Sequence, residues 1–323
     1  MNRPEASPRP HLRRWLPYAI TAAVCWGIWG VLAKGPSREL SGWMTQVLFT
    51  FALIPSATLA CCSKGVRVGT NLFRGICWGF VSGLFAGAGD LCFYLALQSG
   101  ADTAITIPLI SLYPVVTISI AFCWFKERLN LMQVTGIVLA VVAITLLSGG
   151  AISLGHPAEL WRRLGLTPWV FYAAAAMICA GVFTATQKLS TNHISAEMSY
   201  LAWCAAFVAI AVWVMVTKPL NWNMPATMVG SAMAAGALNG FGVIASFAAY
   251  RYEGKAAIVA PLTAALQPLV TVLLAVLFLG ERVGPIEGLG IVFAIGAAAA
   301  LAQETKPPPV SWSHSLANDG NVR

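Results

Sequence analysis

The chain has 323 residues, of which 58% are hydrophobic and only 10% are charged. Soluble globular domains carry about 25% charged residues, so a chain this poor in charge could not cover its own surface in water. The net charge of +8 comes from basic residues in short segments between apolar runs, not from a patch with interleaved aromatic residues, so we expect no nucleic acid partner.

Charged and turn-rich segments divide the chain into ten apolar runs, each about as long as a membrane-spanning helix. The runs cover residues 15–33, 43–62, 75–97, 103–124, 131–149, 168–187, 198–217, 228–250, 256–279 and 286–302. They predict an all-α integral membrane protein with ten transmembrane helices, surrounded by membrane lipids. A basic tail, 1–14, precedes the runs, and the proline-containing segment 304–323 predicts a disordered tail.

The distribution of basic residues predicts the orientation. If the N-terminus is cytoplasmic, 14 of the 20 lysines and arginines fall on the cytoplasmic side and six on the other. This bias follows the positive-inside rule and indicates an even number of spans with both termini cytoplasmic. The longest connection, 150–167, should then be external.

Two side chains in the first and third runs are candidates for a functional site. Trp26 lies deeper than the interfacial belt where tryptophan usually occurs, so it either lines a central cavity or packs between helices. Asp90 is the one charged side chain away from the ends of any run. An aspartate at the bilayer centre costs about 2.5–3.5 kcal/mol to insert, so Asp90 should face a cavity or a partner. It either binds a proton or a cation, or joins helices as a structural group, and Tyr94 shares its face.

The fourth run carries a polar stripe that includes Thr106, Tyr113 and Thr117 on one helix face. Pro114, next to Tyr113, should kink the helix and free a backbone carbonyl near mid-span. We expect Tyr113 to line a solute site, while hydrogen bonding between helices is the alternative.

The eighth and ninth runs supply the opposite wall of the expected site. Asn239 is the main polar residue of the eighth run, and Gln267 and Thr271 lie in the ninth beside Pro268. The candidate solute-binding residues are therefore Trp26, Asp90, Tyr94, Thr106, Tyr113, Asn239, Gln267 and Thr271.

An internal repeat relates the two halves of the chain. A shift of 154 residues aligns 100–143 with 254–297 without a gap, and 13 of the 44 positions are identical. Apolar bias does not explain the matches of Pro114 with Pro268, of Thr117 with Thr271 and of the Glu-Arg pairs. The same shift aligns Gly27 with Gly181, Tyr113 with Gln267 and Asp90 with Ile244.

The repeat predicts two five-helix halves, 15–149 and 168–303, joined by 150–167. Because five is odd, the second half should insert upside down relative to the first. Inverted repeats are typical of secondary transporters, whose two halves exchange conformations around a midplane site.

The pattern of spans and motifs resembles the drug/metabolite transporter superfamily, and its EamA-like permeases in particular, over residues 16–303. The resemblance rests on Trp26-Gly-Ile-Trp-Gly near the start, and on Glu127-Arg-Leu and Gly280-Glu-Arg-Val after the fourth and ninth runs. It implies a central cavity lined by spans one to four and six to nine, with the fifth and tenth spans peripheral.

We therefore expect a carrier of a small solute or metabolite that works by alternating access, without a cofactor or enzymatic activity, in a bacterial inner membrane. Proton coupling stays open, as does the choice between a monomer and a homodimer. One rival is an intramembrane lipid-modifying enzyme, against which the missing cluster of reactive acids or metal ligands argues. The other is a receptor or scaffold, which has no need for inverted repeats.

Overall fold

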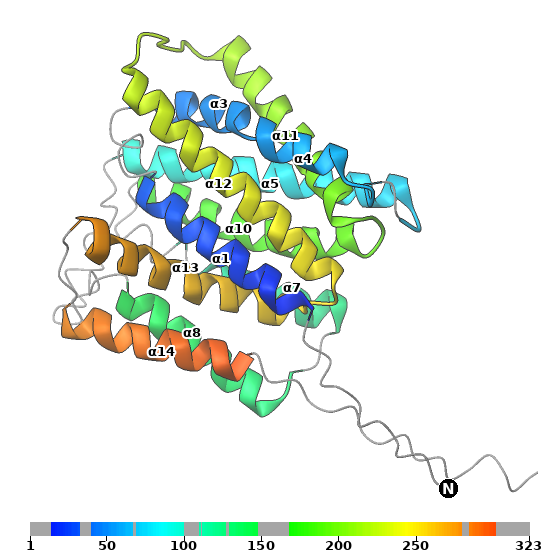
Figure 1. Cartoon of the computed structure of the whole chain (residues 1–323), viewed down its shortest axis with the longest axis vertical. Coiled ribbons are helices and arrows are strands. Elements are labelled where there is room, and N and C mark those ends of the chain that lie inside the picture. The colour runs from blue at the N-terminus through cyan, green and yellow to red at the C-terminus, as the bar shows by residue number, and fades with distance from the viewer. Residues whose placement is uncertain are drawn as a thin grey trace, which may run out of the picture.

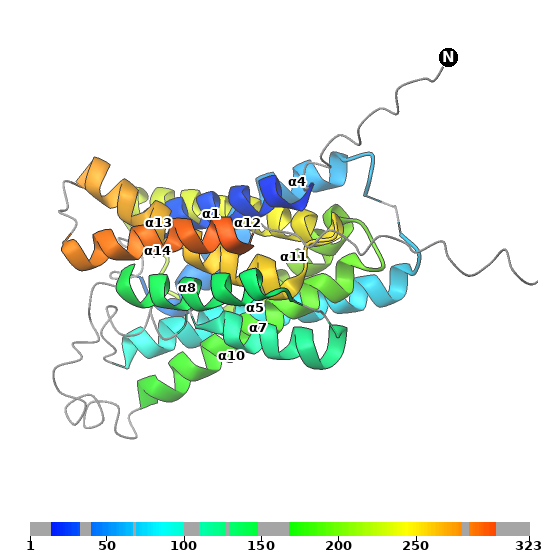
Figure 2. The ribbon, with the colours of Figure 1, turned by 90° about the horizontal axis from the view of Figure 1, so that it is seen from below.

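A computed structural model describes residues 14–32, 40–66, 69–99, 110, 112–126, 129–147, 168–279 and 284–301. Within these ranges every extended regular element is a helix, and the β contact is an isolated bridge between Gly69 and Ile194. The helices lie side by side in one bundle (Figures 1 and 2). Their bounds are α1 (Trp15–Leu32), α3 (Gly42–Ala52), α4 (Ile54–Cys62), α5 (Leu72–Gln98), α7 (Tyr113–Ile120), the π-helix η1 (Ala121–Phe125), α8 (Leu131–Leu147), α10 (Pro168–Thr191), α11 (Ala196–Thr217), α12 (Ala226–Arg251), α13 (Ala256–Leu279) and α14 (Pro285–Leu301).

Helix length and hydropathy indicate a multi-pass membrane protein. In the described part of the chain, five helical segments are long and apolar enough to cross a bilayer, namely Gly42–Cys62, Leu72–Ala96, Pro168–Thr191, Ala196–Thr217 and Ala226–Arg251. Five shorter apolar helices accompany them, Trp15–Trp29, Tyr113–Phe125, Leu131–Ala143, Ala256–Thr271 and Gly288–Leu301. Large apolar side chains cover the outside of the bundle, with Leu131 83% and Val216 80% exposed. Lipid is the solvent that such a surface requires.

The second expected span is interrupted in its middle. Helix α3 ends at Ala52, and α4 begins at Ile54 with Pro55 in its first turn. Proline lacks a backbone N–H and is tolerated in the first turn of a helix, where that donor would have no partner within the helix. The run 43–62 is therefore two short helices joined at Leu53.

The two repeat-related prolines differ in their local structure. Pro114 lies in the first turn of α7, which begins at Tyr113. Pro268 lies inside α13, and the helix continues through it to Leu279. The kink expected at Pro114 stays a prediction, because residues 100–109 and 111 before α7 lie outside the described ranges.

The packing of the helices follows the internal repeat. Extensive contacts across the halves join α5 to α10 and α1 to α12, and these two pairs are exchanged by the shift between repeats. The contacts of α1 with α13 and of α10 with α7 are exchanged in the same way. Helices α8 and α14 pack on each other at one edge of the bundle, the lower edge in Figure 1, in agreement with the expected peripheral position of the fifth and tenth spans.

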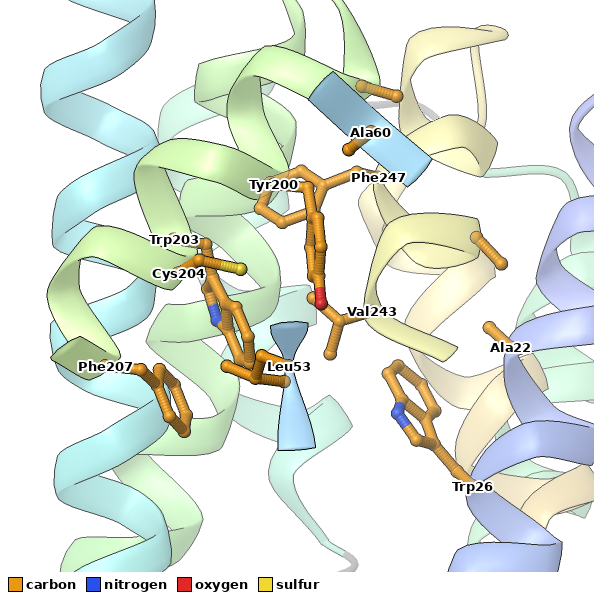
Figure 3. Packing of buried hydrophobic residues seen from close by; sticks show 12 residues of the cluster. Ala22, Trp26, Leu53, Ala60, Tyr200, Trp203, Cys204, Phe207, Val243 and Phe247 are labelled. Atoms are coloured by element: carbon orange, nitrogen blue, oxygen red, sulfur yellow. The ribbon is translucent and has the colours of Figure 1, made fainter. Parts of the chain in front are cut away.

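One buried apolar cluster joins α11 and α12 to the helices of the first half (Figure 3). Tyr200 and Trp203 stack in it with ring centroids 5.6 Å apart, and Phe207 lies 4.0 Å from Trp203. The indole of Trp26 lies on the α1 side of the same cluster, near Val243 of α12. The cluster ties the two halves together.

At one end of the bundle, polar contacts join connections from both halves. The backbone N–H of Thr70 donates to the carbonyl of His193 at 2.8 Å, and the hydroxyl of Ser195 donates to the carbonyl of Val66 at 3.2 Å. Lys188 Nζ donates to the carbonyl of Gly254 at 2.9 Å. The segments 63–71, 188–197 and 250–255 therefore meet at this end.

Candidate functional site

A close junction joins α1 to α13 around Gly27. A Cβ atom on Gly27 would lie 2.5 Å from Val270 Cβ and 3.0 Å from the carbonyl oxygen of Gln267, so a larger residue does not fit without movement. Thr271 Oγ1 lies 2.9 Å from the carbonyl oxygen of Gly27 and 3.1 Å from that of Gln267. In this conformation, the predicted site residue Thr271 thus binds helix backbone.

A second junction joins α10 to α7 around Gly181 in the same manner. A Cβ atom on Gly181 would lie 2.7 Å from Val116 Cγ1 and 3.0 Å from the carbonyl oxygen of Tyr113. Thr117 Oγ1 lies 3.1 Å from the carbonyl oxygen of Gly181, 3.4 Å from that of Tyr113 and 2.5 Å from Thr184 Oγ1.

The two junctions match residue by residue. Gly27 and Gly181 are 154 residues apart, as the sequence predicts. Tyr113 and Thr117 are related to Gln267 and Thr271 by the same shift. The internal repeat is thus visible in individual contacts and not only in helix order.

Tyr113 and Gln267 both lie at the contact between α7 and α13. The phenol oxygen of Tyr113 lies 3.4 Å from the carbonyl oxygen of Ala260 and 3.4 Å from Thr263 Oγ1. Ala260, Thr263 and Gln267 are spaced three and four residues apart and share one face of α13. Tyr113 therefore contacts the face of α13 that also carries Gln267, and both predicted residues are half-buried.

The crossing of α5 with α11 also has a counterpart, α12 with α3, but with a different shift. A Cβ atom on Gly83 would lie 2.7 Å from Ala206 Cβ, and one on Gly236 would lie 2.6 Å from Ala52 Cβ. The alanines are 154 residues apart, whereas the glycines are 153 apart. The shift that relates α5 to α12 is therefore 153 residues, one fewer than the shift of 154 that relates the other helices.

Gly89 and Gly242 are also equivalent with a shift of 153 residues. A Cβ atom on Gly89 would lie 3.2 Å from Cys179 Cβ, and one on Gly242 would lie 3.2 Å from Cys25 Cβ. The repeat equivalent of Asp90 is consequently Val243 and not Ile244. The sequence shift missed this because α12 is apolar near this position and carries no mark of its register.

Asp90 lies on α5, four residues before Tyr94. It is half-buried and shares a helix face with Gly87 and Tyr94, three residues before and four after it. Among the described residues, Asp90 has no hydrogen-bonding partner and no ion pair. The ring centroid of Tyr94 lies 6.4 Å from that of Phe49 on α3, which in turn lies 6.5 Å from that of Trp29 on α1.

The sequence analysis missed Gln46, which lies beside Asp90's helix. Gln46 of α3 is 0% exposed, and neither its amide oxygen nor its amide nitrogen has a hydrogen-bonding partner. Its Nε2 lies 3.5 Å from the position of a Cβ atom on Gly87, one helical turn before Asp90. The signal was present in the sequence, since Gln46 is the one amide side chain in the run 43–62.

The remaining predicted residues lie around α1 and α12. Trp26 is 8% exposed and packs with its indole nitrogen against Gly242, inside the apolar cluster. Asn239 is half-buried and shares a face of α12 with Gly236, which meets α3, and with Val243, which belongs to the cluster. Thr106 lies outside the described residues.

A bound metal ion needs several ligand side chains close together. Within the ranges that the structure describes, no three histidine, cysteine, aspartate or glutamate side chains come together in a manner that could hold one. The predicted site residues offer hydrogen bonding, one carboxyl group and aromatic faces.

Comparisons with known proteins agree with the two-repeat architecture. The model of the EamA-like transporter family matches the chain twice, over residues 13–149 and 167–303. Each match covers one half of the fold described above.

Two individual proteins are similar to the chain. An uncharacterized protein of Methanocaldococcus jannaschii is 37% identical over 71 residues, which are 22% of this chain, and the chain spans 51% of that protein's length. A crystal structure, described simply as that of a protein, is 18% identical with a TM-score of 0.68, covering 89% of this chain and 96% of the other. The second likeness shows the fold alone.

Proposed function

Because the chain belongs to the EamA-like transporter family, we propose that it is a secondary carrier that moves a small solute across a membrane by alternating access. Its proposed topology is ten spans in two inverted repeats. Five long and five shorter apolar helices in the described part of the chain support that count, with the second span formed by α3 and α4 together. Each half then has five spans, and an odd number inverts the second half.

The observation that carries this proposal is the pair of equivalent junctions at Gly27 and Gly181. In two inverted halves, equivalent junctions present their ends to opposite sides of the membrane. A carrier with this symmetry can loosen one junction while it tightens the other, and so opens a shared site to one side at a time.

The proposed solute route lies between the helices that these junctions hold. Tyr113 and Gln267 contribute equivalent side chains from α7 and α13. Asp90, Tyr94 and Asn239 contribute polar groups from α5 and α12. Three further candidates remain, and they are Trp26, Thr106 and Thr271.

The proposed location is a bacterial inner membrane with both termini cytoplasmic. The excess of lysine and arginine in alternate connections supports the orientation. The 250–255 end of the bundle, where Lys188 binds Gly254, would then face the cytoplasm.

A solute screen followed by a transport assay tests the proposal. Purified protein is heated with a panel of metabolites, because a ligand that binds the folded state raises the melting temperature. Each hit is then assayed for exchange across proteoliposomes. Exchange of a bound solute supports a carrier. Chemical conversion of the solute would instead indicate an enzyme, and binding without movement would indicate a receptor or scaffold.

A further inference from the structure

We propose that Gln46, Asp90 and the rings of Phe49 and Tyr94 form a binding site for a small organic cation, namely a protonated amine on an apolar body. This inference rests on the proposed carrier function and names the class of solute that the carrier would take. It assigns a role to Gln46, which the motifs of the sequence do not reveal.

The unpartnered amide of Gln46 is the first argument. Burial of an amide without hydrogen bonds costs free energy, and most buried polar groups in native proteins have a partner. Gln46 is 0% exposed, and both of its amide atoms lack one. A buried group of this kind in a carrier is suited to hydrogen bonding with the transported molecule.

The other repeat shows what a purely structural group looks like at the same place. The equivalent of Gln46 is Tyr200, whose hydroxyl lies 2.6 Å from Ser56 Oγ. Gly240 contacts both of those side chains, as Gly87 contacts Gln46 and Ile210. The equivalent of Ser56 is thus Ile210, whose side chain cannot form a hydrogen bond. The polar pair is complete between α11 and α4, beside Gly240 of α12, and incomplete between α3 and α11, beside Gly87 of α5.

Asp90 gives the incomplete side its charge. Its equivalent is the apolar Val243, so only one half of the bundle carries a carboxyl group at this depth. Helix α3 has no charged residue, and the described charges of α11 and α12 lie at helix ends, as Glu197 and Arg251. Lys188 of α10 is nine residues beyond Cys179, which packs on Gly89, and so lies about 13 Å further along the helix. A carboxylate without a nearby protein cation favours a cationic ligand.

The aromatic rings indicate the rest of the ligand. Phe49 forms edge contacts with both Tyr94 and Trp29, so three rings from α5, α3 and α1 lie in sequence beside Asp90's helix face. Aromatic faces attract ammonium groups and also accommodate apolar bodies. A protonated amine can bind the carboxylate, donate an N–H to Gln46 Oε1 and pack its carbon skeleton against the rings.

The probe for the test is phenethylamine, compared with phenethyl alcohol and hydrocinnamate, which replace the ammonium group by a hydroxyl and a carboxylate. Binding is measured by calorimetry on the full chain in detergent, and we expect the amine alone to bind. The Gln46→Leu variant should bind it at least about tenfold more weakly, because it loses a hydrogen bond to the charged ammonium group, and tenfold corresponds to about 1.4 kcal/mol. Its melting temperature should not fall, since leucine removes an unsatisfied polar group.

Gln187→Leu is the matched control. Gln187 of α10 is equally buried and its Nε2 also lacks a partner, but its Oε1 accepts a hydrogen bond from Ser246 Oγ at 3.0 Å. Loss of that bond should lower the melting temperature and leave amine binding unchanged. The two glutamines thus separate a ligand-binding role from a structural one.

Three outcomes would overturn the inference. These are preferential binding of the alcohol or the carboxylate, unchanged amine binding by Gln46→Leu, and a melting temperature of Gln46→Leu that falls as far as that of Gln187→Leu. Transport of a different solute, without amine binding, would reject the cation class and leave the carrier standing. Gln46-dependent amine binding without movement across proteoliposomes would reject the carrier and leave the binding site.

Discussion

Single glycines set the distance between the two halves of the chain. Gly27 and Gly181 allow α1 and α10 to approach α13 and α7 so closely that threonine hydroxyls reach backbone carbonyls across the contact. Close approach through small residues is a common way to pack helices in lipid, where the hydrophobic effect does not drive them together. Both junctions thus consist of a glycine, a valine and a threonine at equivalent positions.

We expect Gly27→Ala and Gly181→Ala to destabilise the protein by about 1–3 kcal/mol each, because the added methyl group must displace Val270 or Val116. Thermal unfolding in detergent measures the loss. Gly230→Ala is the control, since nothing lies within 4 Å of its Cβ position and alanine favours the helix by about 0.5–1 kcal/mol. If all three variants unfold at the same temperature, the junctions are looser than described.

Tyr113 and Gln267 carry a second prediction at the level of residues. Tyr113→Phe and Gln267→Ala should weaken binding of the solute found in the screen while the yield of folded protein stays near that of the original chain. The hydrogen bonds of Tyr113 are long, at 3.4 Å, so their loss should cost little stability. Equal affinity in both variants, measured by calorimetry, would move the solute site away from α7 and α13.

At the level of helices, the end formed by 63–71 and 188–197 depends on the start of α11. Ser195 accepts a hydrogen bond from the N–H of Met198 at 3.2 Å and donates to the carbonyl of Val66. One side chain therefore caps a helix of the second half and holds a connection of the first half. The start of α11 and the segment 63–71 should loosen together.

We expect Ser195→Ala to destabilise the protein by about 1 kcal/mol, the usual effect of removing a helix cap. Hydrogen exchange should also accelerate both at Met198 and in the segment 63–71. Ser195→Thr retains a hydroxyl and serves as the control. Faster exchange at Met198 alone would show that the link to the first half is unimportant.

Much of the helix arrangement could be predicted from hydropathy, because lipid imposes long apolar runs that are easy to recognise. The break at Leu53 could not, since Pro55 is compatible with both a kinked span and two separate helices. The register of α12 was also missed, because apolar residues around Val243 and Ile244 give an alignment nothing to distinguish them. Gln46 was missed because its burial without a partner depends on which helices pack around α3.

For the whole molecule, the orientation in the membrane can be tested directly. In a chain without its natural cysteines, a cysteine at position 160 should react with an impermeant thiol reagent from outside the cell only. Thr70→Cys, in the exposed connection at the opposite end, should react from the cytoplasm only. Permeabilised cells, in which both should react, provide the control. Labelling of residue 160 from the cytoplasm alone would reverse the proposed topology.

The coupling of solute movement to other ions is also a property of the whole molecule, and a substitution at Asp90 tests it. The substitution Asp90→Asn keeps the shape of the side chain and most of its hydrogen-bonding capacity but removes its ability to carry a charge. If Asp90 binds the ammonium group of the solute, the variant should bind phenethylamine about tenfold more weakly and exchange it more slowly across proteoliposomes.

Two other results have a different meaning and can be distinguished in the same liposomes. A variant that still exchanges solute, but is no longer accelerated by a pH gradient, would assign Asp90 to proton coupling and contradict its role in binding a cation. A variant that keeps binding, exchange and the response to pH would make Asp90 structural. The repeat favours the binding of a cation over a structural role, because the equivalent helix crossing carries the apolar Val243 in place of Asp90. A crossing of this kind therefore does not depend on a carboxyl group, in line with the proposed role of Asp90.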